Sequence, residues 1–347
     1  MIDVFCDVID NYGDAGVCLR LCRDLTKKDI SVNLYCNRTA VLSKILNLYD
    51  KKNELLKIYQ WPDNKENYVA QKIIIQAFSV RLPSFLIENI KLQKSLVINL
   101  EYLTAETFAE ECHQLPSFSD GIQSYFFFPG FTNKTGGVLI EDNYLNLIKK
   151  YRNHTSTSIT VFSYKNDKLK SFIDNLNEFE FEKNLIIFEG KPLDNFNNIY
   201  KTNLLPDCSL KMDNLNILTK KMVSQDEYDE LLCTSFINLV RGEDSIVRAM
   251  LAGKPFLWHI YPQEDNAHIE KINALFDRMN EYCDDKEAVE KLRQITLSYN
   301  GMSNLIDSFD LKEFYKDWKK ISLQWSEHLI SLGSLSSNLI AFLKQKT

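Results

Sequence analysis

The stretch NLVRGEDSIVRAMLAGKPFLWHIYPQ, residues 238–263, predicts a strand, a helix and a second strand in immediate succession. An apolar run ends at Val240, and the helical pattern covers about residues 246–252. The GKP sequence after it ends the helix, because glycine is favoured just past a helix end and proline cannot continue one. The apolar run PFLWHIY comes next. A strand–helix–strand unit of this kind is typical of a parallel α/β sheet.

The same alternation occurs in both halves of the chain. In the first half the strand-like runs are Ile2–Val8, SVNLYC, KIIIQAF and SLVINLEYL, and a second series, SITVFSY, NLIIFEG, LNILTK and FINLV, begins near Ser158. After Tyr261 the pattern is mainly helical. We therefore predict an α/β fold with two Rossmann-like, doubly wound domains that face each other across a cleft and a helical C-terminal tail. The polar stretch KYRNHTSTS separates them, which gives domains over residues 1–152 and 153–333.

Composition restricts the function classes. The chain has 347 residues, enough for two domains, and its net charge of −6 argues against a dedicated nucleic-acid binder. No run of 18 apolar residues predicts a membrane span, and the acidic N-terminal stretch does not resemble a secretory signal. The eight cysteines have no metal-ligand spacing, so we expect reduced, mostly buried thiols in a cytoplasmic protein.

Ligands of doubly wound sheets bind beyond the carboxyl ends of strands, so the loops after strands are the candidate sites. The first is VIDNYGDAG, residues 8–16, which places Asp10 and Asp14 among glycines. One interpretation is a turn followed by a helix cap, since Asp, Asn and Gly favour turns. The other is a carboxylate pair that acts as a general base or flanks a cation. The stretch matches neither a Walker loop nor GxGxxG.

A second candidate loop is Arg241–Ser245, where Gly242 permits a sharp turn and Asp244 or Ser245 can cap the next helix. The free N–H groups of that helix start suit a phosphate or diphosphate, and Arg241 adds a charged fork. Glu243 would be repelled by a diphosphate, so we expect it to contact a sugar hydroxyl or a cationic acceptor. A plain helix cap with a solvated Arg and Glu is the alternative.

The third candidate loop is VFSYKN, residues 161–166, where Phe162 and Tyr164 lie on one face of a strand end. Core packing explains such a pair equally well. The functional interpretation is that one ring stacks on a base while the Tyr hydroxyl meets a phosphate.

Several long motifs occur in the order known from one family. They are DNYGDAGVCLRL, EYLTAETF, FFFPGFTNKTGG, VFSY, VRGEDSIVRAMLAGKPFLWHIYPQ and DNAHIEKINAL, and they extend over nearly the whole chain. In this respect the chain resembles the EarP family, the protein-arginine rhamnosyltransferases that modify elongation factor P. The resemblance implies the GT-B architecture, with a last helix over residues 334–347 that packs back on the first domain.

The resemblance also implies an activity. The family transfers L-rhamnose from dTDP-β-L-rhamnose to one arginine of elongation factor P, with inversion, and the modified factor relieves ribosomes stalled at polyproline. The expected partners are elongation factor P and the donor, with no metal, other cofactor, nucleic acid or membrane. Asp14 matches the general base, and Asp10 and Glu243 complete the catalytic candidates. The donor-binding candidates are Asn11, Tyr12, Gly13, Gly16, Phe162, Tyr164, Met222, Gln225, Arg241, Gly242, Asp244, Ser245 and Gln263.

Two features qualify this expectation. Met222 stands where family members often carry an aromatic residue against the thymine, although a thioether can also pack on a base. Arginine is a poor nucleophile because its guanidinium stays protonated, so we expect Asp10 to hold the fork and Asp14 to take a proton late in the reaction. The alternatives are a GT-B glycosyltransferase or epimerase that acts on a small molecule, and a non-catalytic nucleotide-binding or scaffold protein.

Overall fold

The computed structural model describes residues 1–8, 13–64, 67–263 and 266–346, which form two compact units. One unit comprises residues 1–141 and 332–347, and the other comprises residues 142–331. The first unit thus ends at Glu141 and not at residue 152, because helix α6 (Asp142–Tyr151) belongs to the second unit. There the Tyr144 hydroxyl donates a hydrogen bond to the Arg248 carbonyl at 2.6 Å.

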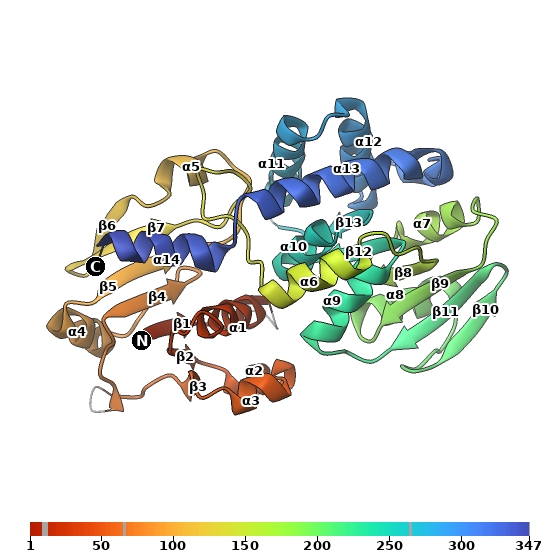
Figure 1. Cartoon of the computed structure of the whole chain (residues 1–347). Coiled ribbons are helices and arrows are strands. Elements are labelled where there is room, and N and C mark those ends of the chain that lie inside the picture. The colour runs from red at the N-terminus through yellow and green to blue at the C-terminus, as the bar shows by residue number, and fades with distance from the viewer. Residues whose placement is uncertain (9–12, 65–66, 264–265, 347) are drawn as a thin grey trace. The chain divides into compact units, whose positions relative to one another are not determined.

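The first unit is a doubly wound α/β domain with a seven-stranded sheet in the order β3-β2-β1-β4-β5-β7-β6. All neighbouring strands are parallel except β6 and β7. The strand order reverses direction between β1 and β4, which makes this pair the switch point of the sheet (Figure 1). Its elements are β1 (Ile2–Cys6), α1 (Gly13–Thr26), β2 (Val32–Cys36), α2 (Thr39–Ile45), α3 (Leu48–Lys52), β3 (Leu56–Gln60), β4 (Ile73–Ala77), α4 (Ser84–Gln93), β5 (Leu96–Leu100), α5 (Phe108–Cys112), β6 (Pro116–Ser119), β7 (Ile122–Phe127) and α14 (Leu335–Lys346).

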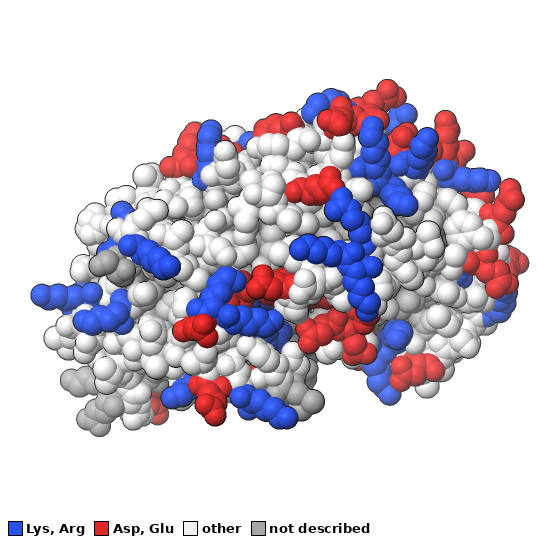
Figure 2. All heavy atoms as spheres, viewed as in Figure 1, with Lys and Arg blue, Asp and Glu red and all other residues white. Residues whose placement is uncertain are grey.

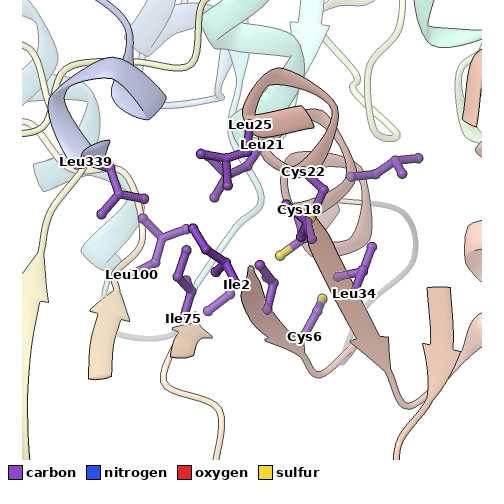
Figure 3. Close-up of a cluster of buried hydrophobic side chains, with 14 of the residues drawn as sticks. Ile2, Cys6, Cys18, Leu21, Cys22, Leu25, Leu34, Ile75, Leu100 and Leu339 are labelled. Carbon is purple, nitrogen blue, oxygen red and sulfur yellow. The ribbon is translucent and has the colours of Figure 1, made fainter. Parts of the chain in front are cut away.

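Apolar side chains cover both faces of this first sheet, as expected for parallel strands. On one face the strand residues pack against α1 and α14, and Figure 3 shows Cys6, Cys18 and Cys22 in this cluster with Leu21 and Leu339. On the other face Phe5 and Ile74 pack with Leu86 of α4. The eight cysteines are free thiols and six of them are buried, which confirms the predicted burial.

Helix α14 is held on the first unit by the loop after β7. The Leu335 N–H donates to the Val138 carbonyl at 2.9 Å, and the Asn338 side chain donates to the Gly136 carbonyl at 3.0 Å. A Cβ on Gly136 would come within 2.5 Å of the Phe127 ring. The glycines of this loop therefore allow a close approach between loop, strand and helix.

The second unit has a six-stranded sheet in the order β10-β11-β9-β8-β12-β13, parallel except for the edge pair β10 and β11. Its switch point lies between β8 and β12, because the chain runs outward from β8 on one side and returns through β12 on the other. Besides α6, its elements are β8 (Ser158–Val161), α7 (Leu169–Leu176), β9 (Lys183–Phe188), α8 (Lys191–Tyr200), β10 (Ser209–Met212), β11 (Leu215–Lys220), α9 (Gln225–Thr234), β12 (Ile237–Arg241), α10 (Glu243–Ala252), β13 (Phe256–His259), α11 (Ala267–Tyr282), α12 (Lys286–Tyr299), η3 (Leu305–Asp307) and α13 (Leu311–Ser331).

The starts of two helices contain site candidates. Helix α1 begins at Gly13, inside the stretch VIDNYGDAG, and α10 begins at Glu243 and not near Ile246 as predicted. In both helices the first turn contains acidic residues, which the positive end of the helix dipole stabilises. Helix α9 begins with a capping box, in which Ser224 and Glu227 bond each other's backbone N–H groups.

Charge on the surface is mixed. On the face in Figure 2 the Lys and Arg side chains are interspersed with Asp and Glu side chains. Among the helices that the structure describes, none is both long enough and apolar enough to cross a membrane.

Candidate functional site

The switch point of the second sheet brings two of the predicted loops together. The Phe162 N–H, just past the end of β8, donates to the Leu239 carbonyl of β12 at 2.9 Å. The loop that starts at Phe162 and the loop that starts at Arg241 therefore leave neighbouring strands at the same edge. This edge is where doubly wound sheets bind their ligands.

Arg241 joins these two loops. Its guanidinium carbon lies 4.4 Å from the centre of the Phe162 ring and 4.9 Å from the centre of the Tyr164 ring. One guanidinium nitrogen donates to the Ser163 carbonyl at 3.3 Å. A guanidinium held over two rings in this way has restricted rotation.

Lys191 also contacts Tyr164, and the sequence analysis missed it. Its ammonium lies 5.3 Å from the centre of the Tyr164 ring, at the first position of α8, which comes after β9 and Gly190. Because β9 pairs with β8, Lys191 and Arg241 reach the same ring from the strands on either side of β8. In the sequence, the strand-like run NLIIFEG is followed by a helix that opens with KP. This pattern was the signal that could have identified Lys191 as a site residue.

His259, at the end of β13, lies behind Tyr164 and was also missed. Its ring packs edge-on against the rings of Tyr164 and Tyr299, with distances between ring centres of 5.6 Å and 5.7 Å. Burial, and after it the positive charge of Arg241, lowers the pKa of His259 to about 4. A neutral imidazole at this position supports the Tyr164 ring without repelling Arg241.

Gly242 forms the transition from β12 into α10. Its φ of +69° lies in the left-handed region that glycine adopts without strain, and Trp258 donates to its carbonyl at 3.2 Å. Gly242 is the N-cap residue, so the prediction that Asp244 or Ser245 caps the helix is wrong. Both residues, with Glu243, lie in the first turn of α10, because the positive φ lets the helix start directly after the strand.

A buried ion pair anchors α10. Arg248 donates two hydrogen bonds to the Asp229 carboxylate, at 3.1 and 2.6 Å, and the Tyr144 ring lies 3.5 Å from its guanidinium carbon. These contacts tie α10 to α9 and α6. Helix α10, whose start lies beside Arg241, is therefore held in place by contacts with two other helices.

The remaining candidates of this unit lie around the start of α9 or farther along the chain. Tyr228, one turn after Gln225, packs edge-on against Phe162 at 5.5 Å, which places this helix beside the Phe162 ring. Met222 is 49% exposed, and its backbone N–H donates to Glu189. Gln263 is exposed, and its backbone N–H donates to His268.

The candidates of the first unit follow β1 in the sequence, and β1 is one strand of the switch point of that sheet. Asp10, Asn11 and Tyr12 lie outside the described residues. Asp14 is half-buried in the first turn of α1, and not in a turn before the helix, while Gly13 is exposed and Gly16 is buried.

Comparisons with known proteins assign the family. The profile of the family described as "Elongation-Factor P (EF-P) rhamnosyltransferase EarP" matches residues 2–344. This chain belongs to the EarP family. The protein-arginine rhamnosyltransferase of Pseudomonas aeruginosa is 30% identical over 98% of both chains, and that of Shewanella oneidensis is 30% identical over 99% of this chain and 97% of its own.

Solved structures support the family's fold. A structure titled "Structural basis for EarP-mediated arginine glycosylation of translation elongation factor EF-P" matches with a TM-score of 0.66 and 20% identity over 99% of each chain. MurG of Acinetobacter baumannii matches with a TM-score of 0.51 and 11% identity over 99% of each chain. The predicted α/β fold of the GT-B class is confirmed. The chain is an enzyme, a glycosyltransferase of the protein-arginine rhamnosyltransferase family.

Proposed function

We propose that this enzyme transfers L-rhamnose from dTDP-β-L-rhamnose to an arginine side chain of elongation factor P, with inversion and without a metal ion. The observation that carries the donor half is the stacked Arg241 at the switch point, beside the first turn of α10. Membership of the EarP family supports the acceptor half. A translation factor as acceptor also implies a cytoplasmic enzyme.

The donor diphosphate would bind between Arg241 and the start of α10. Arg241 supplies a positive charge, and the start of α10 contributes the positive end of its helix dipole. Both strengthen as charge develops on the departing dTDP, so the chain itself can stabilise the leaving group. Glu243 begins the same helix, where its carboxylate can meet a sugar hydroxyl or the incoming guanidinium.

Asp14 would serve as the base. A guanidinium nitrogen attacks the anomeric carbon on the side opposite the diphosphate, the nitrogen–carbon bond forms, and the carbon–oxygen bond to dTDP breaks. A single displacement of this kind inverts the anomeric centre. Because a carboxylate is too weak a base to deprotonate guanidinium beforehand, the proton passes to Asp14 as positive charge builds on the attacking nitrogen.

The test is the intact mass of elongation factor P from the same organism after incubation with this enzyme and dTDP-β-L-rhamnose in the presence of EDTA. We expect a gain of one deoxyhexose on an arginine. Asp14→Asn should abolish the gain, because the amide cannot accept the proton. Asp29→Asn is the matched control: Asp29 is exposed just beyond the far end of α1, so the variant should behave like wild type.

Three results would contradict parts of this proposal. A wild-type enzyme that binds dTDP-β-L-rhamnose but leaves elongation factor P unmodified points to another acceptor, such as a small molecule. An activity that EDTA abolishes contradicts metal independence. Full activity of Asp14→Asn removes that residue from the role of base.

A further inference from the structure

The turn after β4 contains unusual backbone. Phe78 and Ser79 have φ values of +59° and +57°. They are the one place in the described chain where two consecutive non-glycine residues have positive φ. Side chains with a Cβ avoid this region, and such strain is concentrated at functional sites. β4 is half of the switch point of the first sheet, beside β1.

Contacts on several sides hold this turn in place. The Phe78 N–H donates to the Leu100 carbonyl at the end of β5, at 2.7 Å, and the Val80 N–H donates to the Ala77 carbonyl at 3.3 Å. The Phe78 ring is buried and stacks on Tyr102, with the ring centres 4.7 Å apart. The strained backbone thereby orients the Ser79 hydroxyl, which donates to Glu101.

Glu101 is a half-buried carboxylate without a cationic partner among the described residues. Its backbone is fixed, because its N–H donates to the Phe127 carbonyl at 3.0 Å. Its side chain accepts one hydrogen bond from described residues, from Ser79 at 3.4 Å, and burial raises its pKa. The buried Asp50 and Glu141 of the same unit contrast with it, since they pair with Arg23 and Arg20. Glu101 thus loses hydration without gaining a counter-charge.

We propose that Glu101 binds the guanidinium of the acceptor arginine and holds it for Asp14. The inference rests on the proposed function and adds an acceptor-binding residue to it. Glu101 comes directly after β5, two strands from β1 in the order β1-β4-β5, and neighbouring strands are about 4.8 Å apart. Glu101 and the carboxyl end of β1 therefore lie at the same edge of one sheet, and α1, which contains Asp14, is the next helix in the chain after β1.

The chemistry of guanidinium favours two carboxylates. Its donors point in several directions within one plane, so one side can bind Glu101 while a nitrogen on the other side attacks the sugar. Glu101 would stay ionised and orient the fork, and Asp14 would receive the proton. Binding a cation also compensates the carboxylate for its burial, which gives the strained turn after β4 a function.

The variant Glu101→Gln tests this role, with Glu88→Gln as the matched control. Glu88 is exposed on α4 of the same unit, so both variants remove one negative charge. We expect Glu101→Gln to lower kcat/KM for elongation factor P by about tenfold or more, because it removes a charge-assisted hydrogen bond. The affinity for dTDP should not change, and Glu88→Gln should match wild type in both measurements.

The pH profile separates acceptor binding from a merely structural role. In wild type, kcat/KM for the acceptor should fall at low pH as Glu101 takes up a proton and loses its charge. Glu101→Gln should lack that part of the decline. A decline of the same size in the variant contradicts a role for the Glu101 charge.

A binding cycle identifies the cation. Glu101→Gln should weaken binding of elongation factor P, and it should have no further effect on elongation factor P whose modified arginine is replaced by alanine. If the effect persists with that acceptor, Glu101 contacts another group and the inference is wrong. If Glu101→Gln does not fold, Ser79→Ala takes its place. That variant should lower kcat/KM for the acceptor without changing the affinity for dTDP. An unchanged kcat/KM for the acceptor overturns the inference.

The same series separates this inference from the proposed function. If the wild-type enzyme fails to modify elongation factor P, the proposed function is wrong. The cation that Glu101 binds is then not the arginine of that factor. Wild type that modifies the factor, with Glu101→Gln as active as Glu88→Gln, overturns the inference on Glu101 alone.

Discussion

The guanidinium of Arg241 stacks on the ring of Phe162, with 4.4 Å between the guanidinium carbon and the ring centre. Arg241 ends β12 and Phe162 comes directly after β8, so this contact connects the two strands of the switch point. The stack restricts rotation of a long side chain before any ligand arrives. A donor diphosphate would then meet a charge that is already oriented, which lowers the entropic cost of binding.

Arg241→Lys should weaken dTDP binding by about tenfold or more. Lysine keeps the charge, but it lacks the planar fork that stacks on Phe162 and donates two parallel hydrogen bonds. Isothermal titration with dTDP measures the effect. Arg152→Lys, an exposed site in the same unit, is the control and should bind like wild type. Equal affinities of Arg241→Lys and wild type would contradict a role for the guanidinium shape.

Lys191→Met should also weaken dTDP binding, by a smaller factor of roughly three to ten. The ammonium lies 5.3 Å from the centre of the Tyr164 ring, at the start of the helix that follows β9, and its charge adds to that of Arg241. The loss should shrink at high salt, since Lys191 is exposed and its charge is screened. Lys201→Met, at the far end of α8, is the control. A loss equal to that of the control would remove Lys191 from the donor site.

Much of the fold could be predicted from local pattern. The alternation of apolar strands with helices predicts both doubly wound sheets. It also predicts the loops after β8 and β12 as site loops, although the pattern does not show that these two strands are neighbours. The helix starts were less predictable. The prediction for α10 placed its start at Ile246 because Asp244 and Ser245 are good cap residues, whereas Gly242 with its positive φ starts the helix at once.

The missed site residues share one physical cause. Lys191 and His259 reach Tyr164 from β9 and β13, so only the strand order brings them to it. Glu101 is the first residue of the motif EYLTAETF, but its lack of a counter-charge depends on the packing of β4, β5 and β7 around it. Local pattern predicts the loop after each strand, and it does not predict which strands become neighbours.

Asp229→Ala should destabilise the second unit by about 3–5 kcal/mol. Asp229 and Arg248 are both almost fully buried, so the change removes the carboxylate that pairs with a buried guanidinium next to Tyr144. Urea unfolding measures the free energy. The double variant Asp229→Leu with Arg248→Met should recover much of the loss, because it removes both buried charges. A loss below about 1 kcal/mol for the single variant would mean that the pair does not anchor α10.

Acidification should destabilise the fold in the window between about pH 6.5 and pH 4. Burial lowers the pKa of His259 and of His113 to about 4, and His113 also accepts the Phe128 N–H in its neutral form. The unfolded chain, with an ordinary histidine pKa near 6.5, binds more protons in this window, so the free energy of unfolding falls as pH falls.

Each of these groups contributes a slope of up to about 1.4 kcal/mol per pH unit, less for His113 because it is only half-buried. Urea unfolding at pH 7, 6 and 5 measures the slope. His259→Phe should flatten it, because phenylalanine fills the place between Tyr164 and Tyr299 and does not titrate. His154→Gln, at an exposed site, should leave it unchanged. If His259→Phe keeps the wild-type slope, His259 takes up its proton in the folded protein as readily as in the unfolded chain, and it does not support Tyr164 as a neutral ring.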